Sequence, residues 1–296
     1  MPIEPASASP ASPASSPSFA GAEHAEEVLD APGSAESTVP VVLGAGVTDR
    51  GHRRRRNEDS FALTRATTPD GTATVVAVVC DGVASVPGGD TASRTACDVA
   101  VAAGHEAITS GQDLDDVAAT AAEAARKAVS ALAPGSGSAP ACTYVAAVLD
   151  AGRAVVSWAG DSRAYWLCPG SPDESAVLTE DDSWAAEMVA AGIVGADDAL
   201  SDPRAHVITR WLAADAPDVV ARHRSWELDE QGVLFLCSDG VWNHLPEPAV
   251  LAAVLDGMPT DAESVHAGAL ALVDAALAEG GHDNATAVLL ALAPTG

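Results

Sequence analysis

The chain has 296 residues, which is the size of one large domain or two small ones. Apolar residues make up 48% of it, too many for a wholly disordered chain, and aromatic residues only 4%, so alanine, valine and leucine must build the core. Fifteen basic against 42 acidic residues give a net charge of −27. That charge argues against nucleic acid or an anionic membrane surface as a partner. It is compatible with the binding of divalent cations.

Residues 1–40 are dominated by proline, alanine, serine and glutamate, and they show no hydrophobic period. This composition predicts a disordered tail, because it buries too little apolar surface to offset the entropy lost on ordering. We therefore expect the folded domain to span residues 41–296.

Short apolar runs and helical periods alternate through the rest of the chain. The predicted strands are 41–48, 72–79, 143–149, 154–158, 164–167, 219–226, 233–237 and 285–291, and the predicted helices are 90–108, 114–132, 183–191, 247–255 and 262–278. Most strands after residue 139 follow one another without an intervening helix. This order favours an α+β fold with antiparallel sheets covered by helices over a doubly wound parallel sheet.

The five cysteines are scattered, without a Cys-x-x-Cys pair, and four lie in apolar runs. This pattern indicates reduced, mostly buried thiols in a cytoplasmic protein. No uninterrupted apolar stretch reaches about 18 residues, so we expect no membrane span, and the N-terminus does not resemble a secretion signal.

Aspartates fall where apolar runs meet turns. Asp81 and Asp239 each follow a predicted strand and precede a glycine, Asp161 interrupts a third apolar segment, and Asp283 precedes the last strand. A single Asp-Gly pair is most simply an ordinary turn. Four such carboxylates in one chain favour a site for a hard divalent cation, which takes oxygen ligands and offsets their mutual repulsion.

The segment from Thr48 to Asp59 carries five arginines directly after the first predicted strand. An arginine run alone is usually a solvated basic loop. In so acidic a chain this segment is nearly the only dense positive charge, and a guanidinium group suits a phosphate well. Together with the aspartates, it predicts a metal-dependent site that handles phosphate.

The order of these motifs resembles the metal-dependent protein phosphatases of the PP2C type, also called the PPM family, in their bacterial form. The matching residues are Asp49 to Asp59, Asp81-Gly82, Gly160 to Arg163, Ser238 to Gly240 and Asp283-Asn284. The order and spacing agree over about residues 44–292. Each motif alone is a weak signal, but five of them in the family's order are specific to it. The resemblance implies a four-layer α-β-β-α sandwich of two antiparallel sheets flanked by helices.

The resemblance also implies a centre with two Mn²⁺ or Mg²⁺ ions. Asp81 would bridge both ions, Asp239 and Asp283 would bind the first, and the Gly82 carbonyl would bind the second. The remaining implied site residues are Asp59 for metal-bound water, Arg54 for the phosphate, Asn284 for orienting Asp283, and Asp161 for a weaker third ion. Water shared by the two ions would attack phosphorus directly, with no covalent phosphoenzyme.

By resemblance, the substrates are phosphoserine and phosphothreonine in proteins, and the partners are a Ser/Thr kinase and its targets. We expect a monomer. Two alternatives stay open: a catalytically weak or inactive phosphoprotein-binding module on the same fold, and a regulatory phosphoserine phosphatase of a sigma-factor circuit.

Two departures from the family pattern bear on the site. Val83–Val86 stand where relatives have a glycine- and histidine-containing turn, so Val83 cannot serve as a general acid. His52 and His206 are the alternative candidates for that role, although each is more simply a surface or loop histidine. Asn243 stands where a second aspartate often serves the third ion, which predicts weaker binding there.

Overall fold

The computed structural model describes residues 24–29, 42–132, 139–150, 152–195, 198–199, 201–216, 219–228, 232–255 and 257–292. Its longer strands are β1 (His24–Leu29), β2 (Val42–Asp49), β3 (Asp59–Thr67), β4 (Ala73–Asp81), β6 (Tyr144–Leu149), β7 (Arg153–Ala159), β8 (Arg163–Leu167), β11 (Arg222–Glu227), β12 (Val233–Cys237) and β13 (Ala285–Leu292). The short strands are β5 (Ala141–Cys142), β9 (Ala176–Val177) and β10 (Leu212–Ala213). The helices are α1 (Gly89–Thr109), α2 (Leu114–Ser130), α3 (Trp184–Ala190), α5 (Asp239–Trp242), α6 (Pro248–Val254) and α7 (Ala262–Ala278), with a 3-10 turn at Pro172–Glu174.

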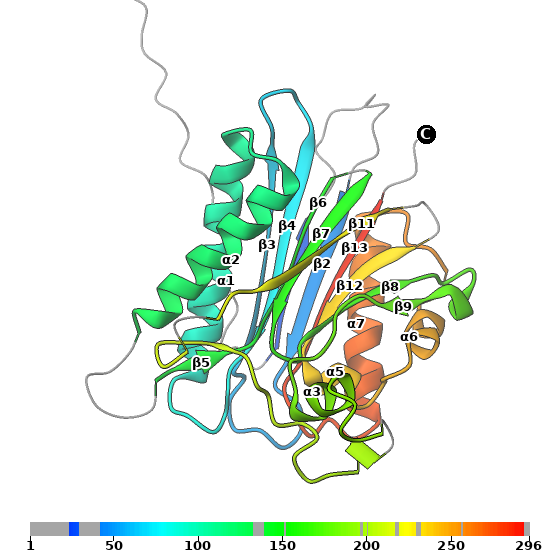
Figure 1. Ribbon diagram of the computed structural model, residues 1–296. Coiled ribbons are helices and arrows are strands. Elements are labelled where there is room, and N and C mark those ends of the chain that lie inside the picture. Colours follow the sequence, from blue (N-terminus) through cyan, green and yellow to red (C-terminus); the bar gives the residue numbers. More distant parts are fainter. Residues whose placement is uncertain are drawn as a thin grey trace, which may run out of the picture.

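Two antiparallel sheets form the centre of the molecule (Figure 1). One sheet has the order β1-β2-β13-β12-β8-β9, the other has the order β11-β7-β6-β4-β3, and β10 pairs separately with β5. The predicted antiparallel α+β class is confirmed. The sheets bury their facing sides against each other through residues such as Phe61, Val145 and Leu290.

Helices cover both outer faces of the sandwich, which gives the four expected layers (Figure 1). Helices α1 and α2 pack on the β3-β4-β6-β7 sheet, where alanines and valines supply a thin apolar layer. Helix α7, with α5 and α6, packs on the β2-β13-β12 sheet through leucines, valines and alanines. No described helix is both long and apolar enough to cross a membrane.

Strand β1 corrects the expectation that residues 1–40 are entirely without structure. Residues His24–Leu29 pair antiparallel with β2, and Ala25 is buried. Side chains add to the backbone pairing: Glu26 contacts His24 at 2.6 Å and His266 of α7 at 2.7 Å. A six-residue strand with charged residues gives too weak a hydrophobic alternation to be recognised by sequence. The rest of residues 1–40 lies outside the described residues.

Strand β3 is a second difference, because the sequence pattern predicts no strand directly after the arginine segment. Its residues alternate between two buried faces: Phe61 and Leu63 point to the inter-sheet core, and Ala62 and Ala66 point to α1. Both faces are apolar, so the polar alternation of a half-exposed strand is missing.

Gly46 on β2 lies under the ring of Phe61, and a methyl group added there would come 2.2 Å from Cε2. We expect Gly46→Ala to lower the free energy of unfolding by about 1–3 kcal/mol, because a packed core resists overfilling. Urea denaturation measures this. Gly170→Ala is the control, because a methyl group there meets nothing within 4 Å, and its change should stay within about 0.5 kcal/mol. Equal effects of the two substitutions would contradict the close contact.

Candidate metal and phosphate site

Five aspartates from separate parts of the sequence meet at one end of the two sheets. Asp59 opens β3 directly opposite Asp81, the last residue of β4. Asp239 begins α5 after β12, Asp283 lies two residues before β13, and Asp161 lies in the turn between β7 and β8. The charges of the other four carboxylates all act on Asp81, which shows that they converge.

Burial and mutual repulsion raise the pKa of four of these carboxyl groups, those of Asp59, Asp81, Asp161 and Asp239. Burial raises the pKa of Asp59 to about 7, although hydrogen bonds to Ser238 and Thr286 work against it. Burial and then the charge of Asp283 raise the pKa of Asp239 to about 6, and burial raises the pKa of Asp161 to about 8. The pKa of Asp81 lies well above its usual range, first through burial and then through Asp59. Concentrated negative charge of this kind favours a bound cation.

Asp59 is 1% exposed and is held from the opposite sheet. Its Oδ2 accepts hydrogen bonds from Ser238 Oγ at 2.6 Å and Thr286 Oγ1 at 2.7 Å. Thr286 Oγ1 also shares a 2.7 Å hydrogen bond with Thr48 Oγ1, which accepts one from Asn57 Nδ2 at 2.9 Å. These hydroxyls fix the carboxylate and leave its Oδ1 without a hydrogen-bond partner among the described residues.

Arg54 lies beside the carboxylates and forms a close ion pair with Asp283, its Nη2 donating to Oδ2. Its side chain remains 36% exposed, so a ligand arriving from solvent can reach the guanidinium group. The charges of Asp81 and Asp239 act on it as well. The structure thus brings the predicted phosphate-binding arginine to the predicted metal ligands.

Asn284 fastens the segment that carries Arg54. Its Nδ2 donates to the backbone carbonyls of Arg50 at 2.8 Å and Arg56 at 2.9 Å, and its Oδ1 accepts from the amide of Glu58 at 2.8 Å. Its own backbone amide donates to Asp283 Oδ1 at 2.8 Å. The side chain therefore positions the arginine segment, while the backbone contacts Asp283.

Two glycines allow the backbone to pack tightly around the site. Gly51 has φ +74°, and a methyl group there would come 2.0 Å from the Asp283 carbonyl oxygen. Gly82 lies against Gly89 and Glu58, so that a methyl group would come 2.5 Å from the Gly89 carbonyl carbon. Any larger residue would push these segments apart.

The altered turn after Gly82 is held by apolar packing. The amide of Val83 donates to the Ala141 carbonyl at 2.9 Å, and the Val83 and Val86 side chains pack against a buried cluster that includes Ala141. The residues that replace the family's histidine-containing turn therefore have a structural role.

The surroundings of Asp161 are built by Trp242 and Arg163. Trp242 Nε1 donates to the Asp161 carbonyl at 2.8 Å, and the Arg163 guanidinium lies 3.7 Å from the Trp242 ring centroid while pairing with Asp181. Asn243 Nδ2 donates to Asp239 Oδ2 at 3.2 Å. Asn243 thus supports Asp239 where a carboxylate would add another negative charge.

The chemistry of this donor set fits hard divalent cations. Asp59 Oδ1 and Asp239 Oδ1 are buried and lack hydrogen-bond partners among the described residues. Within the same residues, no three His, Cys, Asp or Glu side chains already form a cage for one ion. A cation here would complete its coordination with water and backbone carbonyls, as Mg²⁺ commonly does.

Several residues support the site through contacts that the sequence does not predict. Ser238 and Thr286 hold Asp59, and Thr143 Oγ1 accepts from the Asp81 amide at 2.9 Å and pairs with Ser162 Oγ at 2.7 Å. The available signal was a serine directly beside an aspartate, as at Ser238 and Ser162, whereas Thr143 lies 62 positions from Asp81 and carries no such signal. His206 comes within 6.2 Å of the Trp242 ring, measured between centroids.

The model of the protein phosphatase 2C family matches residues 48–279. A serine/threonine phosphatase, stp, of Listeria innocua is 28% identical over 251 residues, covering 82% of this chain and 93% of the relative. The serine/threonine protein phosphatase PstP of Mycobacterium tuberculosis is 30% identical over 257 residues, which are 84% of this chain and 45% of PstP.

Solved structures agree with the sequence relatives. The crystal structure of the Mycobacterium tuberculosis phosphatase PstP superposes with a TM-score of 0.70 at 26% identity, covering 86% of this chain and all of that one. A structure of the PstP catalytic domain in complex with two manganese ions shares the fold, with a TM-score of 0.66 at 23% identity over 86% of this chain and all of that one. The chain belongs to the protein phosphatase 2C family.

Manganese should stabilise the protein more at high pH than at low pH. The raised pKa values mean that the folded protein binds more protons than the unfolded chain between about pH 4 and pH 8. Without metal, the free energy of unfolding therefore falls as pH rises through this window. A cation that binds the deprotonated carboxylates cancels this loss.

The measurement is the melting temperature with Mn²⁺ or with EDTA, at pH 5.5 and pH 8. We expect the manganese-induced increase to be larger at pH 8 by about 3 °C or more. Asp239→Asn should lose most of that difference. An equal increase at both pH values would contradict a carboxylate site.

Proposed function

We propose that this phosphoprotein phosphatase hydrolyses phosphoserine and phosphothreonine residues in proteins and uses two Mn²⁺ or Mg²⁺ ions. The observation that carries the proposal is the convergence of Asp59, Asp81, Asp239 and Asp283 beside Arg54, with oxygens left unpartnered among the described residues. The specificity of the stp and PstP relatives supports the choice of substrate residues. The manganese-bound fold relative supports the choice of metal.

Asp81, Asp239, Asp283 and the Gly82 carbonyl would hold the two ions. When bound, such a pair lowers the pKa of a water molecule and balances charge on the phosphoryl oxygens. Asp59 Oδ1 is the oxygen available to accept a hydrogen bond from that water, since Oδ2 is already held by Ser238 and Thr286.

Arg54 would bind the substrate phosphate through its exposed guanidinium group. Its present partner is the Asp283 carboxylate, and if Asp283 held a cation instead, Nη2 would be available to a phosphoryl oxygen. Asn284 keeps this arginine in place by fastening both ends of its segment. A fixed positive charge at the phosphoryl group stabilises negative charge in the transition state without reorganisation.

The same site and the cysteines bear on a third ion and on the cellular compartment. Asp161 would serve a third, weaker ion, since Asn243 adds no charge there. The protein would act in the cytoplasm as a monomer, opposite a Ser/Thr kinase; the five free, buried cysteines support a reducing compartment. Neither the binding-module nor the sigma-circuit alternative is favoured by the site, which retains the family's carboxylates and Arg54.

Turnover of para-nitrophenyl phosphate should require Mn²⁺ and Asp239. We expect Asp239→Ala to lower kcat/KM by at least about 100-fold, because the site loses a ligand. Asp98→Ala, which removes an exposed carboxylate on α1, is the control and should keep the activity. A rate that is the same with EDTA and in Asp239→Ala would support the binding module instead.

Replacing Arg54 should impair the chemical step more than metal binding. We expect Arg54→Ala to lower kcat/KM on a phosphothreonine peptide by roughly 100-fold, through loss of one fixed donor to the phosphoryl oxygens. Arg54→Lys should recover only part of this, because an ammonium group lacks the planar fork. Arg53→Ala, an exposed neighbour, is the control. Full activity of Arg54→Ala would remove Arg54 from the proposal.

A further inference from the structure

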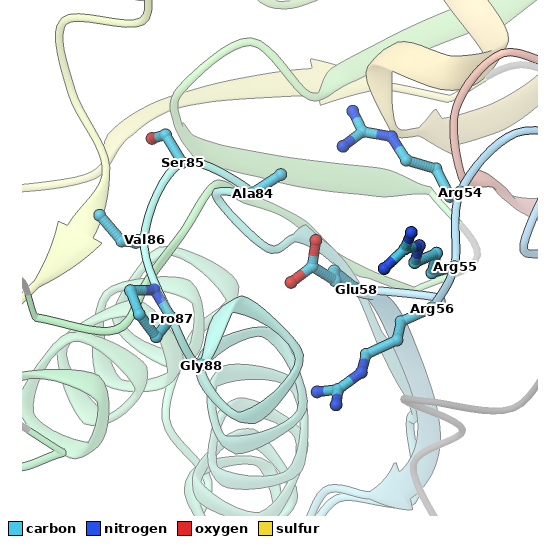
Figure 2. Close-up of a pocket in the computed structure, with 9 residues that line it drawn as sticks. All are labelled: Arg54, Arg55, Arg56, Glu58, Ala84, Ser85, Val86, Pro87 and Gly88. Carbon is cyan, nitrogen blue, oxygen red and sulfur yellow. The ribbon is translucent and has the colours of Figure 1, made fainter.

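A groove runs away from Arg54 along the arginine segment (Figure 2). It has a volume of about 520 Å³. One wall and the floor are Arg54, Arg55, Arg56 and Glu58, and the other wall is the turn from Ala84 to Gly88. Because Arg54 belongs both to this groove and to the phosphate site, the groove is continuous with the place where the substrate phosphate would bind.

Arg55 and Arg56 are held less by ion pairs within the protein than Arg54 is. Both are exposed, and no acidic side chain among the described residues pairs with Arg55. Arg56 is 76% exposed and reaches Asp90 only at 3.9 Å, the outer limit of an ion pair. Such a contact contributes little, so both guanidinium groups are available to a ligand.

The opposite wall offers no competing charge. Residues 84–88 are alanine, serine, valine, proline and glycine, and they end where α1 begins. The helix starts at Gly89 without a side-chain capping hydrogen bond, so the positive end of its dipole lies beside the groove. Among the described residues, the carboxylates in this region are Glu58 at the floor of the groove, Asp90 in the first turn of α1, and Asp283, which is paired with Arg54.

We propose that Arg55 and Arg56 form a second anion-binding subsite, which selects phosphoprotein segments carrying an acidic or phosphorylated residue within a few positions of the residue to be dephosphorylated. This inference rests on the proposed phosphatase function and deepens it by naming a substrate class. In a chain of net charge −27, an acidic substrate is otherwise repelled, so a local positive groove decides whether it can bind.

The test compares phosphothreonine peptides that differ only near the phosphorylated residue. One peptide has alanines around it, the second has two aspartates after it, and the third has two aspartates before it. The full chain with Mn²⁺ is assayed for kcat/KM on each peptide. The quantity compared is the ratio between the better aspartate peptide and the alanine peptide, so any general loss of activity cancels.

The wild-type ratio should be roughly fivefold or more, as expected for contacts with exposed arginines. In Arg55→Ala/Arg56→Ala it should fall below about twofold, and in Arg55→Lys/Arg56→Lys most of the preference should return, since lysine keeps the charge. Arg53→Ala removes one charge from the same segment, but Arg53 does not line the groove, so the ratio should persist. A wild-type ratio near one, or an equal loss in Arg53→Ala and the double alanine variant, would overturn the subsite.

Binding separates this inference from the proposed function. Fluorescence anisotropy of the labelled peptides in EDTA measures their dissociation constants without turnover. We expect the aspartate peptide to bind more tightly than the alanine peptide, and this difference to depend on Arg55 and Arg56. If no peptide and no para-nitrophenyl phosphate is hydrolysed with Mn²⁺, the phosphatase proposal fails, and the anisotropy ratio still decides whether the groove binds acidic segments.

Discussion

The repulsion among buried like charges is the constraint on which the site depends. Asp59, Asp81, Asp161, Asp239 and Asp283 meet where water is partly excluded, and burial together with neighbouring negative charge raises the pKa of the first four. A flexible chain would relieve that cost by moving the carboxylates apart. Here the pairing of β3 with β4 and of β12 with β13 holds most of them in place, so the fold itself maintains a position that only protons or cations can neutralise.

Hydroxyl groups connect the two sheets at this end of the sandwich. Asp59 belongs to one sheet, whereas Thr286 belongs to the other and Ser238 directly follows one of its strands. Their hydrogen bonds set the separation of the sheets beside the site and orient one carboxylate oxygen toward it. Asn284 extends the same arrangement to the arginine segment, so that anionic and cationic parts share one support.

The sequence predicts the parts of the fold that repeat a simple pattern. Long amphipathic helices such as 114–130 and fully apolar strands such as 233–237 follow from periodicity. Strand β3 does not, because both of its faces are buried, and β1 does not, because charged side chains obscure its alternation. A sequence pattern reveals a strand or helix when one face is apolar and the other polar, and neither of these strands shows that difference clearly.

The candidate site was predictable in its aspartates and arginines but not in its supporting contacts. Aspartates at strand ends are visible because a charge interrupts an apolar run, as at Asp81 and Asp239. Serine and threonine occur throughout the chain, so nothing in the sequence marks Thr286 as the partner of a residue 227 positions away. The interaction of Arg54 with Asp283 likewise depends on a turn that only the three-dimensional structure places.

Strand β1 has a consequence for how the protein behaves in solution. It is the edge strand of the six-stranded sheet and covers β2, whose outward-facing amides and carbonyls would otherwise lie open. Open edges recruit strands from other molecules, whereas a short strand bearing Glu26 and Glu27 discourages them by its charge. Without β1, the edge of β2 would therefore be open to pairing with strands of other molecules.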